Sequence, residues 1–75
     1  MKENEVDLFI NDIGKRIREF RKNQKMTQLD LAIKSNVDER QIQRLESSHT
    51  SATLKTLYKV IKGLETDFET FFKGI

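Results

Sequence analysis

Residues 26–47 read MTQLDLAIKSNVDERQIQRLES, and this pattern predicts two short helices joined by a tight turn. Thr27 is a good N-cap for the first helix, and Asp30 stands three residues later, as in a capping box. We expect Ser35 and Asn36 to end that helix, because asparagine tolerates the left-handed backbone conformation that a sharp turn needs.

The second of these helices has an apolar side and a polar side. Asp38 is placed to cap it, with Gln41 at the matching third position, and Ile42 and Leu45 face inward. With about 3.6 residues per turn, four residues lie opposite Ile42. These are Arg40, Gln43, Arg44 and Ser47. Guanidinium and carboxamide groups on one helix face suit the base edges and phosphates of nucleic acid, although a solvated charged face is the simpler alternative.

Composition narrows the class of protein. The chain has 75 residues, which we interpret as a single domain, residues 1–75, with a small core. It has no cysteine, which excludes a disulfide scaffold, a zinc finger and a thiol nucleophile. The single histidine, His49, has no partner at metal-ligand spacing, so we expect no metal and no cofactor. No stretch is long enough to cross a bilayer, and the sequence predicts a cytoplasmic protein that is not an enzyme.

The positive charge is concentrated in one part of the chain. The formal net charge is only +2, too small to indicate nucleic-acid binding by itself. Residues 13–48, however, contain nine Lys or Arg and five acids, a net charge of +4, whereas the remainder has a net charge of −2. This asymmetry would orient the domain on a polyanion.

A long amphipathic helix is predicted before the central stretch. Its apolar residues recur every three or four positions. They are Val6, Phe9, Ile10, Ile13, Ile17 and Phe20. Asn4 or Asp7 would cap this helix after a frayed segment at residues 1–5, and it should end near residues 23–25. Gly14 weakens it and marks a kink or a close packing contact.

Two further helices are predicted after the central stretch and a polar loop. Thr53 would cap the first, and Gly63 would help to end it. Its buried side should contain Leu54, Leu57, Tyr58, Val60, Ile61 and Leu64. In the second, at residues 66–75, Thr66 and Glu69 have capping-box spacing. The fold class is therefore all-α, a compact bundle of about five helices with a central helix-turn-helix.

The central stretch resembles the helix-turn-helix of lambda-repressor-like, Cro-type regulators of bacteria and phages, also called the xenobiotic-response-element family. The matching positions are Thr27-Gln28, Leu31-Ala32, Val37, Ile42, Leu45-Glu46, Thr53-Leu54, Leu57 and Leu64. The resemblance covers roughly residues 13–72. The sequence differs from the family pattern at three positions. Asn36 stands where glycine is usual, Ser48 where glycine is often found, and Ala52 where proline is often found.

The resemblance implies a sequence-specific transcription regulator that binds double-stranded DNA as a homodimer. Two copies of helix 38–47 would enter successive major grooves of a near-palindromic operator. The expected base contacts are Glu39, Arg40, Gln41, Gln43 and Arg44. The expected phosphate contacts are Thr27, Gln28, Ser47, Ser48 and His49. Glu39 could instead interact with the helix dipole, and His49 could be an ordinary exposed loop residue.

The resemblance also implies an ion pair and a dimer contact. Arg21 and Glu46 occupy the positions of a family ion pair that orients the reading helix, although both could be solvated surface charges. The last helix commonly builds the dimer contact in this family. Its candidates here are Phe68, Phe71, Phe72 and Ile75, too many apolar residues for so short a helix to bury. Core closure is the alternative for this cluster, and an antitoxin whose cluster binds a protein toxin is the rival function.

Overall fold

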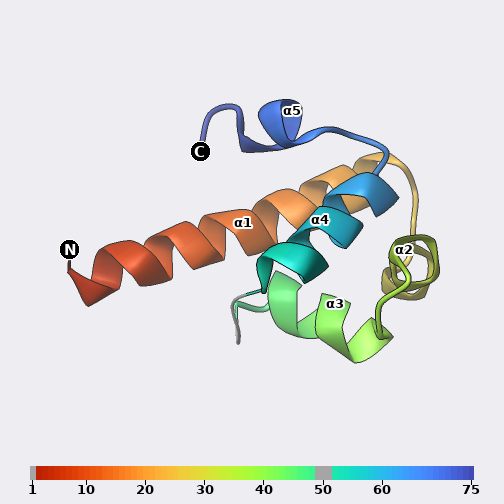
Figure 1. The fold of residues 1–75 in the computed structure, drawn as a ribbon, viewed down its shortest axis with the longest axis horizontal. Coiled ribbons are helices and arrows are strands. Elements are labelled where there is room, and N and C mark those ends of the chain that lie inside the picture. Colours follow the sequence, from red (N-terminus) through yellow and green to blue (C-terminus); the bar gives the residue numbers. More distant parts are fainter. Residues whose placement is uncertain (1, 49–51) are drawn as a thin grey trace.

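The computed structural model describes residues 2–48 and 52–75, which form five α-helices and no strand (Figure 1). The helices are α1 (Glu3–Asn23), α2 (Gln28–Ser35), α3 (Glu39–Glu46), α4 (Leu54–Gly63) and α5 (Phe68–Phe72). The prediction of an all-α bundle of about five helices with a central helix-turn-helix is confirmed. His49, a predicted phosphate contact, lies outside the described residues.

Helix α1 is the longest element, and its N-terminal half projects beyond the body of the molecule (Figure 1). The helix begins at Glu3, with Lys2 in the N-cap position and no side-chain cap. The predicted cap at Asn4 or Asp7 is therefore wrong, whereas fraying of the first residues stays a prediction. The carboxylates of Glu3 and Glu5 in the first turn interact favourably with the helix dipole, which supports an early start without a cap.

The two central helices begin and end as their sequence predicts. Thr27 and Asp30 form a complete capping box, with the Asp30 N–H donating to the Thr27 hydroxyl at 3.0 Å and the Thr27 N–H donating to the Asp30 carboxylate at 2.9 Å. Asn36 has φ 56° and ψ 46°, the left-handed conformation expected at the turn. The Asp38 carboxylate caps α3 by accepting the Arg40 N–H at 2.8 Å, two residues on, rather than through a capping box with Gln41.

The core lies where α1, α2, α3 and α4 meet. It contains Ile17, Met26, Leu31, Ala32, Ile42, Leu45, Leu57, Val60, Ile61, Leu64 and Phe71. Two glycines permit close backbone contacts in it. A Cβ on Gly14 would lie 2.4 Å from the carbonyl oxygen of Leu45, and a Cβ on Gly63 would lie 2.1 Å from the Ser35 hydroxyl oxygen. Helices α1 and α3, and α2 and α4, therefore approach each other more closely than larger residues would allow.

Helices α4 and α5 differ from the sequence prediction in two ways. Leu54 and Tyr58 are 84% and 55% exposed, because they lie at the edge of the buried side of α4. Their neighbours among the described residues, such as Phe68 beside Tyr58, cover them only in part. Helix α5 is capped by Asp67, whose carboxylate accepts the Thr70 N–H at 2.7 Å, and not by the predicted Thr66. The predicted capping box was therefore out of register by one residue.

Candidate nucleic-acid interface

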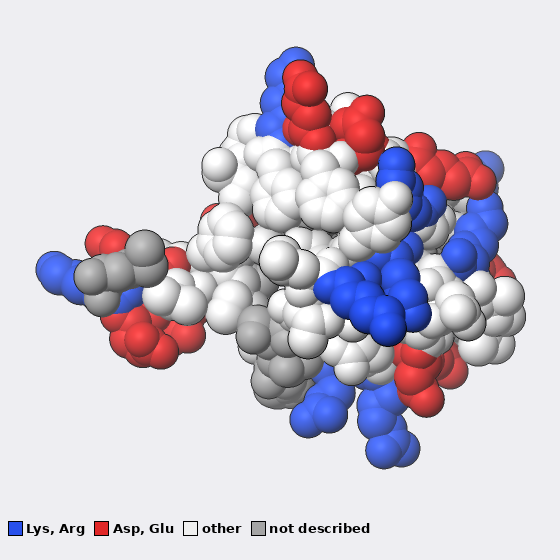
Figure 2. All heavy atoms as spheres, in the orientation of Figure 1, with Lys and Arg blue, Asp and Glu red and all other residues white. Residues whose placement is uncertain are grey.

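Helix α3 presents one side to the core and the opposite side to solvent. Ile42 is fully buried and Leu45 is nearly so. Arg40, Gln43 and Arg44 are exposed, as the helical spacing predicts. Figure 2 shows Lys and Arg side chains projecting from the lower side of the molecule, where Figure 1 places α3. The long polar side chains of α3 are thus available to a ligand outside the protein.

Two further residues predicted to read bases flank this exposed row. Glu39 and Gln41 are half-buried. Gln41 lines a shallow polar groove together with Asp38, Arg40 and Arg44. Glu39 lies in the first turn of α3, so its carboxylate also interacts favourably with the helix dipole. The structure therefore brings all five predicted base-reading residues onto one short helix, with the two arginines and Gln43 most accessible.

An ion pair fixes the orientation of α3. The Arg21 guanidinium donates two hydrogen bonds to the Glu46 carboxylate, from Nε at 2.7 Å and from Nη2 at 3.0 Å. Both side chains are almost completely buried, with exposed fractions of 10% and 5%. Nη1 of Arg21 also donates to the carbonyl oxygen of Met26 at 2.7 Å. The predicted pair is present, and it joins α1, the α1–α2 loop and the end of α3 through planar, charge-assisted hydrogen bonds.

Gln28, predicted to contact phosphate, makes a contact within the protein that the sequence did not reveal. Its side-chain amide donates to the Glu46 carboxylate at 3.2 Å, and the residue is half-buried. Gln28 therefore links the first turn of α2 to the last turn of α3. The two residues are separated by 18 positions, and no local spacing signal joins them.

Thr27 and Asp30 make the start of α2 rigid. The hydrogen bond from the Thr27 backbone N–H, followed by that involving its side chain, holds the pKa of Asp30 below its usual value of 3.8. Asp30 is therefore ionised at neutral pH and keeps the capping box closed. The first turn of α2 is thus fixed beside α3, with its N–H groups at the positive end of the helix dipole.

The serines after α3 are held by contacts within the protein. The Ser47 hydroxyl donates to the carbonyl oxygen of Arg44 at 3.2 Å. Ser48 has a left-handed backbone, with φ 63°, and its hydroxyl donates to the Asn11 side chain at 2.9 Å. Ser48 is half-buried, so the predicted phosphate contact of this residue would need its backbone or a rearranged hydroxyl.

The aromatic residues of α5 divide between core and surface. Phe71 is fully buried and packs on Phe20, with ring centroids 5.5 Å apart, so it closes the core and cannot present a dimer surface as predicted. Phe68 and Ile75 are exposed, at 36% and 40%, and Phe72 is half-buried. Tyr58 of α4 lies 5.8 Å from Phe68, centroid to centroid. The exposed aromatic surface of α4 and α5 therefore consists of Tyr58, Phe68 and Phe72, and the sequence analysis missed Tyr58.

Residues 2–48 and 52–75 contain no cluster of three or more His, Cys, Asp or Glu side chains that could hold a metal ion. None of the helices formed by these residues has the length and hydropathy needed to span a membrane.

The sequence matches the family model described as Helix-turn-helix over residues 17–71. Among solved structures, the wild-type restriction-modification controller protein C.Esp1396I is 36% identical, with a TM-score of 0.82 over 85% of this chain and 83% of that one. The C.Esp1396I tetramer in complex with its natural 35 base-pair operator matches equally well, over 85% and 84% of the two chains.

A more distant likeness is to the controller protein C.AhdI from Aeromonas hydrophila. It is 23% identical, with a TM-score of 0.82 over 87% of this chain and 98% of that one, and this likeness shows a shared fold. A search of curated proteins found no match.

Proposed function

This chain belongs to the lambda-repressor-like helix-turn-helix family of DNA-binding transcription regulators, and we propose that it binds a near-palindromic operator as a homodimer. Helix α3 of each protomer enters the major groove, and the two α3 helices lie about 34 Å apart, one turn of B-DNA. The protein acts in the cytoplasm, where bacterial and phage DNA is transcribed.

The observation that carries this proposal is the exposed polar side of α3. Arg40, Gln43 and Arg44 face solvent, whereas the buried Ile42 and the Arg21–Glu46 pair hold the opposite side to the body of the protein. A reading helix needs both properties, because base recognition requires a fixed orientation as well as accessible donors and acceptors.

Each side chain has a role that follows from its chemistry. Arg40 makes a bidentate contact with guanine, and Gln43 or Gln41 reads adenine through its carboxamide. Arg44 reaches a base or a phosphate. Glu39 accepts a hydrogen bond from cytosine or supports Arg40.

The phosphate contacts position α3 without reading sequence. The N–H groups at the start of α2, beside Thr27 and Gln28, face a phosphate, with the Gln28 amide shared between that phosphate and Glu46. Ser47, Ser48 and His49 follow α3, and this segment lies along the sugar–phosphate backbone.

The similarity to controller proteins supports a more specific role. C.Esp1396I is a restriction-modification controller protein that binds a 35 base-pair operator as a tetramer. We infer that this chain likewise controls expression in a restriction–modification system, with two dimers on a long operator. Its 36% identity over most of both chains favours this role over the alternative of an antitoxin, whose exposed aromatic residues would bind a toxin.

The proposal is tested by selecting bound sequences from a random DNA library and titrating salt on the best binder. The expected product is a site with two inverted half-sites about one helical turn apart, bound with a steep loss of affinity as salt rises. Enrichment of no sequence, or of a single unrepeated half-site, would contradict it. Light scattering with and without a selected duplex distinguishes the dimeric regulator from an antitoxin that is stable only with a protein partner.

A further inference from the structure

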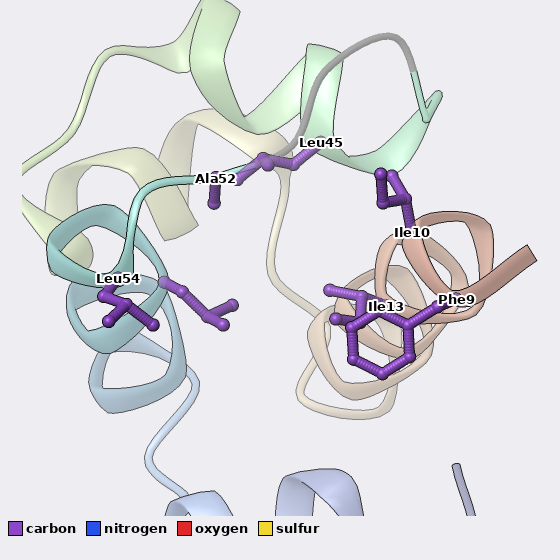
Figure 3. A pocket seen from close by; sticks show the side chains of 7 residues that line it. Phe9, Ile10, Ile13, Leu45, Ala52 and Leu54 are labelled. Carbon is purple, nitrogen blue, oxygen red and sulfur yellow. The ribbon is translucent and has the colours of Figure 1, made fainter. Parts of the chain in front are cut away.

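An apolar groove opens between α1 and α4, and nothing in the described residues fills it (Figure 3). Its volume is about 190 Å³, and it is lined by Phe9, Ile10, Ile13, Leu45, Ala52, Leu54 and Leu57. In Figure 3, α1 and α4 lie on opposite sides of the groove, with α3 above it and α5 below it. Phe9 is 49% exposed and Leu54 is 84% exposed, so both rims are apolar and open to solvent.

We propose that this groove, together with the projecting N-terminal part of α1, forms part of the homodimer interface. The occupant of each groove is the second copy of the chain, and the N-terminal part of α1 in one protomer lies against α4 of the partner. This inference rests on the proposed function, because it assigns more of the surface through which the dimer forms.

The area that a stable interface buries favours a dimer contact that includes the groove as well as the aromatic surface of α4 and α5. Such an interface buries about 800 Å² on each partner. An aromatic side chain buries roughly 150–250 Å² when fully covered. Tyr58, Phe68 and Phe72 are already about half-covered, so they can add only about 300 Å² between them. The groove is continuous with that surface, because Leu54 lies one helical turn before Tyr58 on α4.

The charges beside the groove form a self-complementary pattern. On α1, Glu5 and Asp12 stand four residues before and three residues after Phe9, so they flank it on the same side of the helix. On α4, Lys55 stands three residues before Tyr58 and Lys62 four residues after it, so these lysines likewise flank Tyr58 on one side of the helix. The α1 side beside Phe9 therefore carries two carboxylates, with Arg16 one turn beyond Asp12, and the α4 side carries lysines. Figure 2 shows acidic side chains gathered on the projecting end of α1 and basic ones over α4.

The direction of the two-fold axis follows from this pattern. If the axis runs along the groove from α5 towards α3, the acidic edge of each protomer faces the basic edge of its partner. The same rotation leaves the α3 helices of both protomers at the same end of the axis (Figure 3). A two-fold operator requires that arrangement, with both reading helices presented to one side of the DNA. An axis across the groove would instead bring acid against acid and lysine against lysine.

The test compares Leu54→Glu with Leu29→Glu by sedimentation velocity without DNA. Both leucines are exposed and lie in the first turn of a helix, where the new carboxylate suits the dipole, so both variants should fold. Leu54→Glu places a charge in the apolar centre of the proposed interface and should raise the dimer dissociation constant at least about tenfold. Leu29→Glu, on α2, should leave it unchanged. Equal dimerisation of both variants and the wild type would overturn the inference.

A charge exchange tests the direction of the axis. Glu5→Lys with Asp12→Lys should weaken the dimer, as should Lys55→Glu with Lys62→Glu. All four substitutions in one chain should restore dimerisation, because the basic and acidic edges are simply exchanged. Failure of the fourfold variant to recover would exclude this pairing of edges.

One further variant distinguishes this inference from the proposed function. If Phe68→Glu prevents dimerisation while Leu54→Glu does not, the dimer forms through the aromatic surface alone and the groove has no part in it. If the wild-type chain itself stays monomeric both alone and on DNA, dimeric operator binding fails as well.

Discussion

At the scale of single residues, the contact that most affects α3 is the buried pair of Arg21 and Glu46. A buried guanidinium is tolerated only while its donors are satisfied, and two of its three hydrogen bonds go to Glu46. Removing either partner would leave an unpaired charge in the protein interior, and we therefore expect a large loss of stability when the pair is broken. Gln28 adds a third donor to the same carboxylate.

Glu46→Ala should lower the free energy of unfolding by about 3–5 kcal/mol, because it leaves a buried arginine without its counter-ion. Urea unfolding followed by circular dichroism measures this loss. The matched control is Glu65→Ala, which breaks the exposed pair between Lys34 and Glu65 and should cost less than about 1 kcal/mol. Similar losses for the two variants would show that the buried pair contributes no more than a surface pair.

Arg40→Ala should weaken binding to the selected operator by about 1–3 kcal/mol and relax the preference at one base position. Gln28→Ala should instead weaken binding to all sequences more evenly, because it removes the proposed phosphate contact and the hydrogen bond from Gln28 to Glu46. Fluorescence anisotropy on the operator and on single-base variants separates the two effects. Unchanged affinity in both variants would place the reading face elsewhere.

At the scale of helices, much of the fold follows from local sequence signals. The cap residues Thr27, Asp38 and Thr53 were predictable, and so was the left-handed Asn36. The start of α1 and the cap of α5 were not, because dipole effects and neighbouring capping candidates compete within one or two residues. The exposure of Leu54 and Tyr58 was also unpredictable, since periodicity gives the buried side of a helix but not how far its neighbours cover it.

Gly14→Ala should destabilise the protein by about 1–3 kcal/mol, although alanine is intrinsically the better helix former. The new Cβ would meet the carbonyl oxygen of Leu45 at 2.4 Å, and a backbone atom cannot rotate away. Thermal unfolding measures the loss, and operator binding should weaken as α3 is pushed outward. An equally stable variant would show that α1 and α3 can separate freely.

Gly63→Ala should also destabilise the protein, but here the new Cβ would meet a side chain, that of Ser35, and not a backbone atom. The Ser35 hydroxyl oxygen is buried and has no hydrogen-bond partner among the described residues. Adding Ser35→Ala to Gly63→Ala should therefore recover part of the lost stability.

Acid should weaken the start of α5 through Asp67. Its hydrogen bonds with Thr70, first that from the backbone N–H, hold its pKa below the usual value of 3.8. A depressed folded pKa means that the contribution to stability is complete above pH 3.8 and is lost as the pH falls from there through the folded pKa. Thermal unfolding between pH 5 and pH 2 measures this, and Asp67→Asn should remove part of the pH dependence while keeping a capping oxygen. An unchanged profile would contradict this role.

At the scale of the whole molecule, the buried aromatic residue of α5 serves folding, whereas the exposed aromatic residues are available for assembly. Phe71 closes the core, whereas Tyr58, Phe68 and Phe72 are accessible to another molecule. The sequence predicted that the terminal aromatic cluster was too large to bury. It could not predict which rings would be covered, because that depends on contacts such as Phe20 with Phe71, 51 positions apart.

Phe68→Glu should leave the monomer folded but weaken the dimer, and operator binding should weaken with it because one protomer alone reads only a half-site. Phe71→Ala should instead destabilise the monomer by about 3–5 kcal/mol. Light scattering and circular dichroism on both variants distinguish assembly from folding. Full operator affinity of a monomeric Phe68→Glu variant would refute the need for a dimer.

The contact of Gly14 with the backbone of α3 bears on how this protein could acquire new targets. Helix α3 is held against the rest of the protein by its contact with Gly14, by buried apolar residues and by one ion pair. The position of α3 therefore does not depend on which residues stand at 40, 43 and 44. If these residues make the proposed base contacts, mutations there would change the recognised base pairs while the scaffold is preserved. Related regulators in the same cell could thus come to recognise different operators, without binding each other's sites, through changes in only a few exposed residues of α3.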